Sequence, residues 1–96
     1  MAISGDPRKN ESNIKKHGID FRDVPELFEG PCLEGIDGRF DYAEERVIAF
    51  GEIQGRVIAV VYTCRDGRRR IVSARKATKA EAKTFSEVTF SEVGFF

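Results

Sequence analysis

A hairpin between residues 56 and 75, followed directly by a capped helix, most constrains what this chain can fold into. Residues 56–63 are almost entirely apolar, which predicts a central strand covered on both faces. Asp66-Gly67 is a strong signal for a tight turn between antiparallel strands, and residues 69–75 then return. Strict alternation along the return strand predicts one face with Arg69, Ile71, Ser73 and Arg75, and a second face with Arg70, Val72 and Ala74.

Two helices are predicted before the sheet begins. An Asp-Pro pair opens residues 7–17, and Gly18 supplies the left-handed position that ends them. Residues 19–29 contain a second, shorter helix, in which Asp23 is the predicted N-cap. Glu26 stands three residues after Asp23, as in a capping box.

A third helix and two further strands complete the predicted fold. Thr78 and Glu81 form a capping box, so this helix begins at Lys79. Weaker strand patterns cover residues 32–37 and 44–51. Because short turns join successive strands, we predict an α+β fold of order α-α-β-β-β-β-α, with a four-stranded antiparallel sheet, two N-terminal helices and one C-terminal helix.

The chain has 96 residues, which is the size of one domain. We assign residues 1–85 to that domain. Residues 84–88, Thr-Phe-Ser-Glu-Val, are repeated as residues 89–93, and this five-residue period matches neither a helix nor a strand. Residues 86–96 are therefore treated as an apolar tail that packs on the domain, on a second copy or on a partner.

Charge is strongly polarised along the chain, although the formal net charge is zero. Residues 56–83 carry nine Lys/Arg against two acidic residues, a balance of +7. Residues 20–52 carry ten Asp/Glu against three arginines, a balance of −7. A basic field of this kind attracts a polyanion, which makes nucleic acid the first ligand to consider.

Cysteine and histidine content argues against a metal site. Cys32 and Cys64 form no CxxC motif, and His17 is the single histidine, so we expect two reduced thiols, no cofactor and metal-free chemistry. The sequence contains no 18-residue apolar run and no signal peptide, which predicts a cytoplasmic protein without membrane contacts.

Motifs in four segments resemble the BrnT family of type II toxins, which belong to the RelE-like ribonuclease superfamily. The resemblance covers nearly all of residues 3–85. The similar segments are Lys16-His17-Gly18 with Phe21, Glu45-Arg46 with Gly51, Val60-Val-Tyr62-Thr63, and Ser73-Ala-Arg75-Lys-Ala-Thr78 with Glu81. Two positions depart from the family pattern, because Gly5 stands where the family has Trp and Phe85 stands where it has Tyr.

This resemblance implies a toxin that cleaves RNA, inhibits translation and is neutralised by a BrnA-like antitoxin. It also implies that DNA is contacted only through the antitoxin, in an operon-repressing complex, with a homodimer or a toxin–antitoxin heterotetramer as the assembly. The departures at Gly5 and Phe85 keep open a catalytically weak or inactive RNA- or partner-binding module of the same fold. The aromatic tail keeps open a third class, a purely structural interaction protein.

Metal-free RNA cleavage moves the 2′-hydroxyl onto the adjacent phosphate, and it requires a base, an acid and cations. Arg46 and Arg75 are our candidate phosphate clamps, because both come from strands and a guanidinium fork matches phosphate oxygens. Arg46 is alternatively a surface ion pair with Glu44 or Glu45.

Three further residues are candidates for the catalytic site. His17 has an ordinary pKa near neutrality and can act as acid or base, or else it caps the first helix. Glu45 acts as a base only if burial raises its pKa, and otherwise it is simply solvated. Tyr62 donates a hydrogen bond or stacks on a base, or it is a core residue.

The remaining cations are predicted to attract the RNA backbone without reading its sequence. Alternatively, the arginine run is a solvated turn that blunts a sheet edge, or a surface that an acidic antitoxin covers. The predicted RNA-binding residues are Lys16, Arg68, Arg69, Arg70, Lys76, Lys79 and Lys83.

Overall fold

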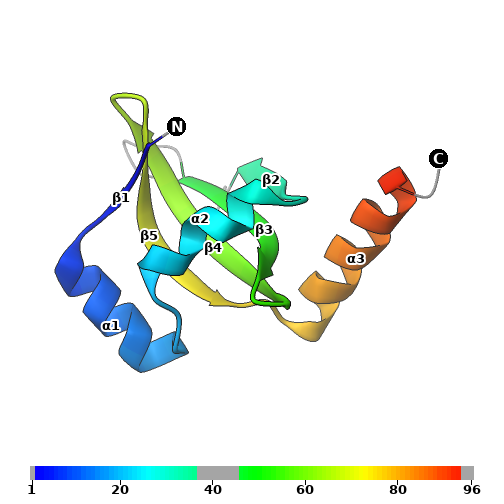
Figure 1. Cartoon of the computed structure of the whole chain (residues 1–96), viewed down its shortest axis with the longest axis horizontal. Helices are drawn as coiled ribbons and strands as arrows, with labels where there is room; N and C mark the ends of the chain where they lie inside the picture. The colour runs from blue at the N-terminus through cyan, green and yellow to red at the C-terminus, as the bar shows by residue number, and fades with distance from the viewer. Residues whose placement is uncertain (1, 37–45, 94–96) are drawn as a thin grey trace.

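The computed structural model describes residues 2–36 and 46–93, and this part of the chain forms a five-stranded sheet with three α-helices (Figure 1). The α+β class is confirmed. The elements are β1 (Ala2–Gly5), α1 (Pro7–His17), a 3₁₀ turn (Phe21–Asp23), α2 (Val24–Glu29), β2 (Leu33–Ile36), β3 (Arg46–Ile53), β4 (Arg56–Arg65), β5 (Arg68–Lys76) and α3 (Lys79–Val93).

The strand order is β1-β5-β4-β3-β2, so β4 lies at the centre, as its apolar run predicts. The predicted four-stranded antiparallel sheet is wrong in one respect. A fifth strand, β1, pairs in parallel with β5 and places Gly5 opposite Ile71. β1 has only four residues, which are too few to show the alternation of apolar and polar side chains that is typical of a strand. This segment is a strand because it pairs with the outer edge of β5.

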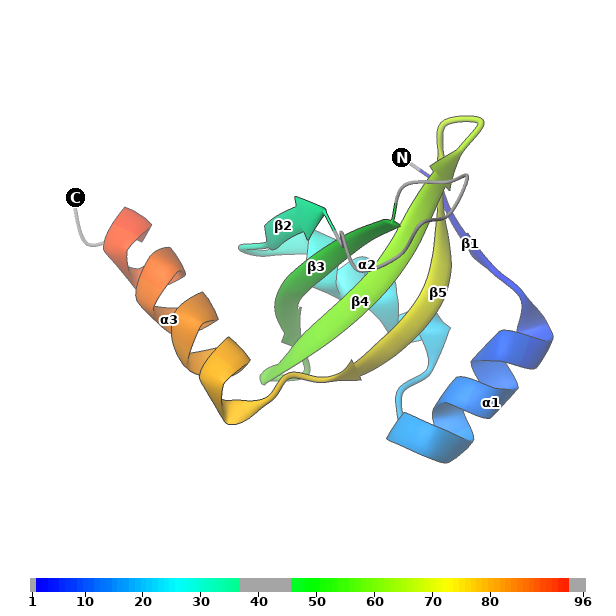
Figure 2. The same ribbon diagram turned by 180° about the vertical axis from the view of Figure 1, so that it is seen from behind.

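The two faces of the sheet differ in what covers them. α2 packs on one face, here called the helix face, where Val24 and Leu27 meet Ile58, Val60 and Ile71 in the core. Figure 2 shows the opposite face, here called the open face, with α2 behind the strands and α3 to one side. Alternation places the β4 side chains of Val57, Ala59, Val61 and Thr63 on this open face.

α1 lies along the part of β5 that extends beyond β1. The buried Asn13 side chain donates to the Ala74 carbonyl at 2.8 Å and accepts from the Ala74 N–H at 3.1 Å. Its amide therefore takes the place of a neighbouring strand. Asn13 also donates to the Ile19 carbonyl at 2.9 Å, which fixes the chain leaving α1 against the sheet.

A β-bulge interrupts β5 and corrects the predicted faces of that strand. Val61 lies opposite Ser73, but Tyr62 lies opposite Ile71, so Val72 has no partner on β4. Side chains therefore change faces at Val72. The open face receives Arg68, Arg70, Ser73 and Arg75, whereas Arg69, Ile71 and Ala74 belong to the helix face.

Local signals at turns and at the first helix are confirmed. Asp66 and Gly67 both have positive φ, 50° and 74°, as a two-residue hairpin turn requires. α1 occupies residues 7–17 as predicted, with the Asp6 carboxylate accepting from the Arg8 N–H at 2.8 Å. Gly18 follows in the left-handed region at φ 71°.

The second helix, α2, begins at Val24 directly after Asp23, as the predicted N-cap position requires, but its capping bonds differ from the prediction. The Asp23 side chain makes no capping bond there; Asp20 instead accepts from the Arg22 N–H at 2.9 Å and starts the 3₁₀ turn. Glu26 does not complete a capping box. Its carboxylate accepts from the Gln54 N–H at 2.7 Å and secures the β3–β4 turn to α2.

α3 begins at Lys79 through the predicted capping box. The Thr78 N–H donates to Glu81 at 2.8 Å, and the Glu81 N–H donates to the Thr78 hydroxyl at 3.1 Å. The helix then continues to Val93, so the repeated segment is helical as far as residue 93, contrary to our expectation. In both views α3 points away from the sheet (Figures 1 and 2).

Candidate functional site

Three side chains form a row across the open face at the hairpin end of the sheet. Arg46 on β3 lies opposite Thr63 on β4, and Thr63 lies opposite Arg70 on β5. Two strand spacings separate the arginine Cα atoms by about 10 Å. Arg46 is half-buried, Thr63 is buried and Arg70 is exposed. This row thus presents two guanidinium groups, with a threonine between them, on strands that fix their positions.

Arg75 lies farther along β5 on the same face, but Glu81 holds its guanidinium. The Arg75 Nη1 and Nη2 atoms donate to the two Glu81 carboxylate oxygens at 2.8 and 3.0 Å. The Arg75 side chain is 32% exposed. Hydrogen bonds from Arg75, then from the backbone of Thr78, lower the pKa of Glu81 to about 2 against the opposing effect of burial.

His17 and Lys16 lie at the β5 edge of the sheet, in the last turn of α1. They line a recess of about 230 Å³ together with Ser12 and Ser73. Lys16 and His17 are both exposed, and Ser73 belongs to the open face. The structure therefore brings these two predicted residues to the border of the open face, with β4 and β5 between them and Arg46.

Tyr62 and Arg69 belong to the helix face instead. The buried Tyr62 hydroxyl donates to the Glu34 carboxylate at 2.5 Å, and its ring meets Phe28 edge to face at 5.7 Å between centroids. The Arg69 guanidinium lies 4.1 Å from the Phe28 ring centroid. Burial and the bond to Glu34 raise the pKa of Tyr62. The structure does not bring Tyr62 or Arg69 together with Arg46.

A comparison with protein families identifies this chain's family. A family model described as "Ribonuclease toxin, BrnT, of type II toxin-antitoxin system" matches residues 6–81, from the cap of α1 to the first turn of α3. This chain belongs to the BrnT family. No curated protein sequence matches it. Family membership confirms the resemblance found in the sequence, and it gives the coarse function: a ribonuclease toxin of a type II system, with an antitoxin as its partner.

The other predicted residues of this BrnT family member are dispersed. Glu45 lies outside the described residues. Arg68 is exposed on the open face near the hairpin turn. Three lysines are exposed at the end of β5 and on α3: Lys76, Lys79 and Lys83. The Lys83 Nζ atom lies 4.0 Å from Oε1 of Glu87. No described helix is long and apolar enough to cross a membrane.

Two hydroxyl residues of the site were missed by the sequence analysis. Thr63 separates the arginines of the row, and Ser73 borders the His17 recess. Both fall inside segments that carry the BrnT resemblance, which is the signal that identifies them. The sequence predicted Ser73 on the same face as Arg69, but the bulge at Val72 changes the parity of β5 and separates these two residues.

The two departures from the BrnT pattern have structural explanations. A Cβ atom at Gly5 would lie 2.7 Å from Cδ2 of Phe21, so the Phe21 ring occupies the space beside this position. Phe85 is only 3% exposed, and a ring without a hydroxyl suits that environment. A side chain at position 5 would therefore require the Phe21 ring to move.

Proposed function

We propose that this BrnT family member is an endoribonuclease that holds RNA on the open face of its sheet. The row formed by Arg46, Thr63 and Arg70 is the observation that carries this proposal. Its guanidinium groups can donate to phosphate oxygens, and their positions on the two strands that flank β4 pre-organise them for the charge that develops at phosphorus.

The proposed reaction needs no metal ion. The 2′-oxygen attacks the adjacent phosphorus, the bond from phosphorus to the 5′-oxygen breaks, and the products carry a 2′,3′-cyclic phosphate and a 5′-hydroxyl. A base removes the 2′-hydroxyl proton and an acid protonates the leaving oxygen. The described residues contain no group of three or more His, Cys, Asp or Glu side chains arranged to hold a metal ion. The proposal therefore assigns charge stabilisation to arginines.

His17 and Glu45 are the proposed acid–base residues. His17 is exposed beside Ser73 at the border of the open face, where RNA lying on the arginine row can extend to it. Glu45 directly precedes Arg46 in the sequence. Tyr62 has its hydroxyl committed to Glu34 on the helix face, so we propose a packing role for it.

Arg75 has two roles in this proposal. Its bidentate bond to Glu81 joins β5 to α3, and its remaining exposed surface lies on the same face as Arg70. We therefore place Arg46 and Arg70 in first contact with phosphate and Arg75 beside them. Lys16 and Arg68 extend the cationic surface at its two ends.

The antitoxin of this system is proposed to be BrnA-like, to neutralise the toxin in the cytoplasm, and to supply the only contact with DNA. Released toxin inhibits translation by cutting RNA. A second candidate function is an RNA-binding module without cleavage. The ion pair between Arg75 and Glu81 favours this second function, because the Arg75 guanidinium bonds to a carboxylate and is less able to bind a phosphate.

Purified protein incubated with 5′-labelled RNA in EDTA separates these two functions. The proposal predicts fragments that end in a 2′,3′-cyclic phosphate. Intact RNA that is retained on the protein in a salt-dependent manner would establish the binding module instead. RNA that is neither cut nor retained would exclude both functions for the isolated toxin.

A further inference from the structure

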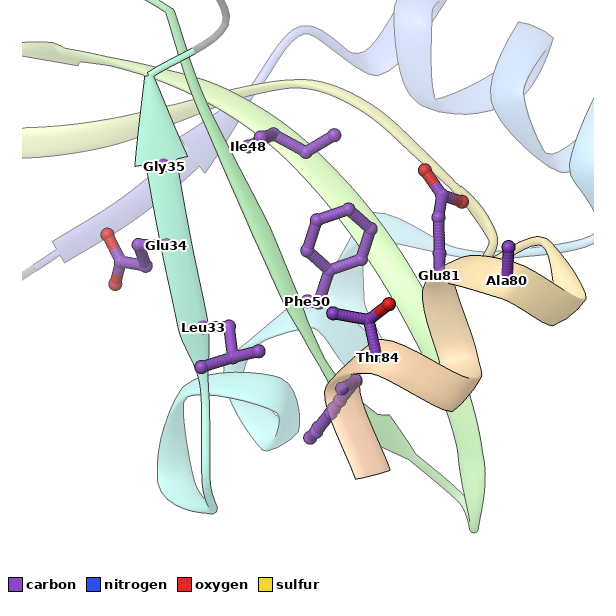
Figure 3. Close-up of a pocket in the computed structure, with 9 residues that line it drawn as sticks. Leu33, Glu34, Gly35, Ile48, Phe50, Ala80, Glu81 and Thr84 are labelled. Carbon is purple, nitrogen blue, oxygen red and sulfur yellow. The ribbon is translucent and has the colours of Figure 1, made fainter. Parts of the chain in front are cut away.

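An apolar groove of about 370 Å³ separates the start of α3 from strands β2 and β3 (Figure 3). Leu33, Ile48 and Phe50 form its floor on the open face, and Thr84 and Phe85 form its α3 wall. The groove therefore lies beside the arginine row on the same face of the sheet, because Ile48 follows Arg46 by two residues on β3.

The lining chemistry disfavours RNA as the occupant. The described residues that line the groove are mainly apolar and include no lysine, arginine or histidine. Two glutamates also line it, but the Glu34 carboxylate bonds to Tyr62 on the helix face and Arg75 holds the Glu81 carboxylate. A phosphate backbone placed here would find no cationic side chain among the lining residues, whereas an apolar protein segment complements them.

The α3 wall of the groove continues beyond the part that touches the sheet. Phe85 is buried, but Val88, one turn later, is 37% exposed, and α3 points away from the sheet at this level (Figure 1). An apolar helix face without packing is a typical protein-interaction surface. A segment lying in the groove would cover Val88 and the sheet floor together.

We propose that this groove is the docking site for an apolar segment of the antitoxin, the partner that the family description names. The inference rests on the proposed function, in which an antitoxin neutralises the ribonuclease. It adds the surface and the chemistry of the bound segment.

An antitoxin segment bound in this groove lies next to the surface that is proposed to bind RNA. Phe50 in the groove floor lies opposite Ala59, which lies opposite Arg75, so two strand spacings separate the floor from Arg75. Glu81 both lines the groove and holds the Arg75 guanidinium. An antitoxin segment here therefore lies against the face on which RNA binds and blocks it sterically.

A matched pair of variants on α3 tests the groove. Thr84 and Ser86 are both exposed and both small, but two residues along a helix turn the side chain by about 200°, so Thr84 lines the groove and Ser86 does not. Thr84→Arg fills the groove and places a charge in its apolar lining. Ser86→Arg adds the same group elsewhere. The probe is the BrnA-like antitoxin proposed above, titrated against each full-length toxin by calorimetry.

We expect Thr84→Arg to weaken antitoxin binding by about 30-fold or more, the loss typical of an interface hot spot, and Ser86→Arg to bind like the native toxin. Equal affinity of all three proteins, or equal loss in both variants, would overturn the proposal. A native toxin dimer that Thr84→Arg converts to a monomer would also overturn the proposal, because a second copy would then occupy the groove.

RNA cleavage is measured in parallel for all three proteins. If none of them cuts RNA and only Thr84→Arg loses antitoxin binding, the proposed catalysis fails and the docking site stands.

Discussion

The Glu81 carboxylate joins two elements of the fold, because it accepts two hydrogen bonds from Arg75 on β5 and a third from the Thr78 N–H at the start of α3. Glu81→Gln keeps the size of the side chain but removes its charge. We expect the free energy of unfolding in urea to fall by about 1–2 kcal/mol, the scale of a lost cap and a charge-assisted bond. Glu87 is an exposed carboxylate on the same helix, and Glu87→Gln should change the free energy of unfolding little. A similar loss in both variants would contradict the role of Glu81 in joining β5 to α3.

The same pair predicts a pH dependence of stability. The folded-state pKa of Glu81 is about 2, below its ordinary value of 4.5, so the ionised form is the one that the fold stabilises. Its contribution is present above pH 4.5 and is lost as the pH falls towards 2. Unfolding measured across this window should show a difference between native protein and Glu81→Gln that shrinks with falling pH. A constant difference would disagree with the lowered pKa.

Close packing of α2 on β3 depends on a glycine. A Cβ atom at Gly51 would lie 2.6 Å from Cγ of Leu27, in the core of the helix face. Gly51→Ala should therefore lower the free energy of unfolding by about 1–3 kcal/mol. Gly35→Ala on β2 is the control, because nothing lies within 4 Å of the added carbon. Stabilisation by both substitutions would show that α2 moves aside without cost.

The two cysteines should differ in reactivity. Burial, reinforced by the charge of Glu34, raises the pKa of the Cys32 thiol to about 11, whereas Cys64 is exposed on β4. Because the thiolate is the reactive form, iodoacetamide at neutral pH should alkylate Cys64 first and Cys32 only after unfolding. Mass spectrometry of timed samples reads this order, and faster labelling of Cys32 would contradict it.

Local signals predicted much of this fold. Asp66-Gly67, Gly18 and the Thr78–Glu81 box each specify a conformation through bonds made within a few residues. These signals require no knowledge of the tertiary structure, and the corresponding turns and helix ends were predicted correctly. The Asp23 side chain makes no capping bond, because Asp23 ends the 3₁₀ turn in a helical conformation. Glu26 bonds instead to the distant Gln54 N–H.

Long-range pairing accounts for what the sequence did not predict. β1 depends on the outer edge of β5, and the bulge at Val72 depends on the register between β5 and β4. The face of every arginine on β5 follows from that register. The sequence therefore placed Arg69 opposite Arg70 correctly, but it grouped Arg69 with Arg75, whereas Arg69 lies on the helix face over Phe28.

The central claim is that RNA is cut on the open face at the row containing Arg46 and Arg70. Its most direct test is kcat/KM for RNA cleavage in EDTA by the native toxin, Arg46→Ala, Arg70→Ala and Arg56→Ala, the last being an exposed arginine that lies off the open face. We predict losses of about 100-fold or more for each row variant, the scale of a removed oxyanion donor, and near-native cleavage for Arg56→Ala. Equal, small losses in all three variants would mean that these arginines only attract RNA, and would contradict the claim that the row is the site of cleavage.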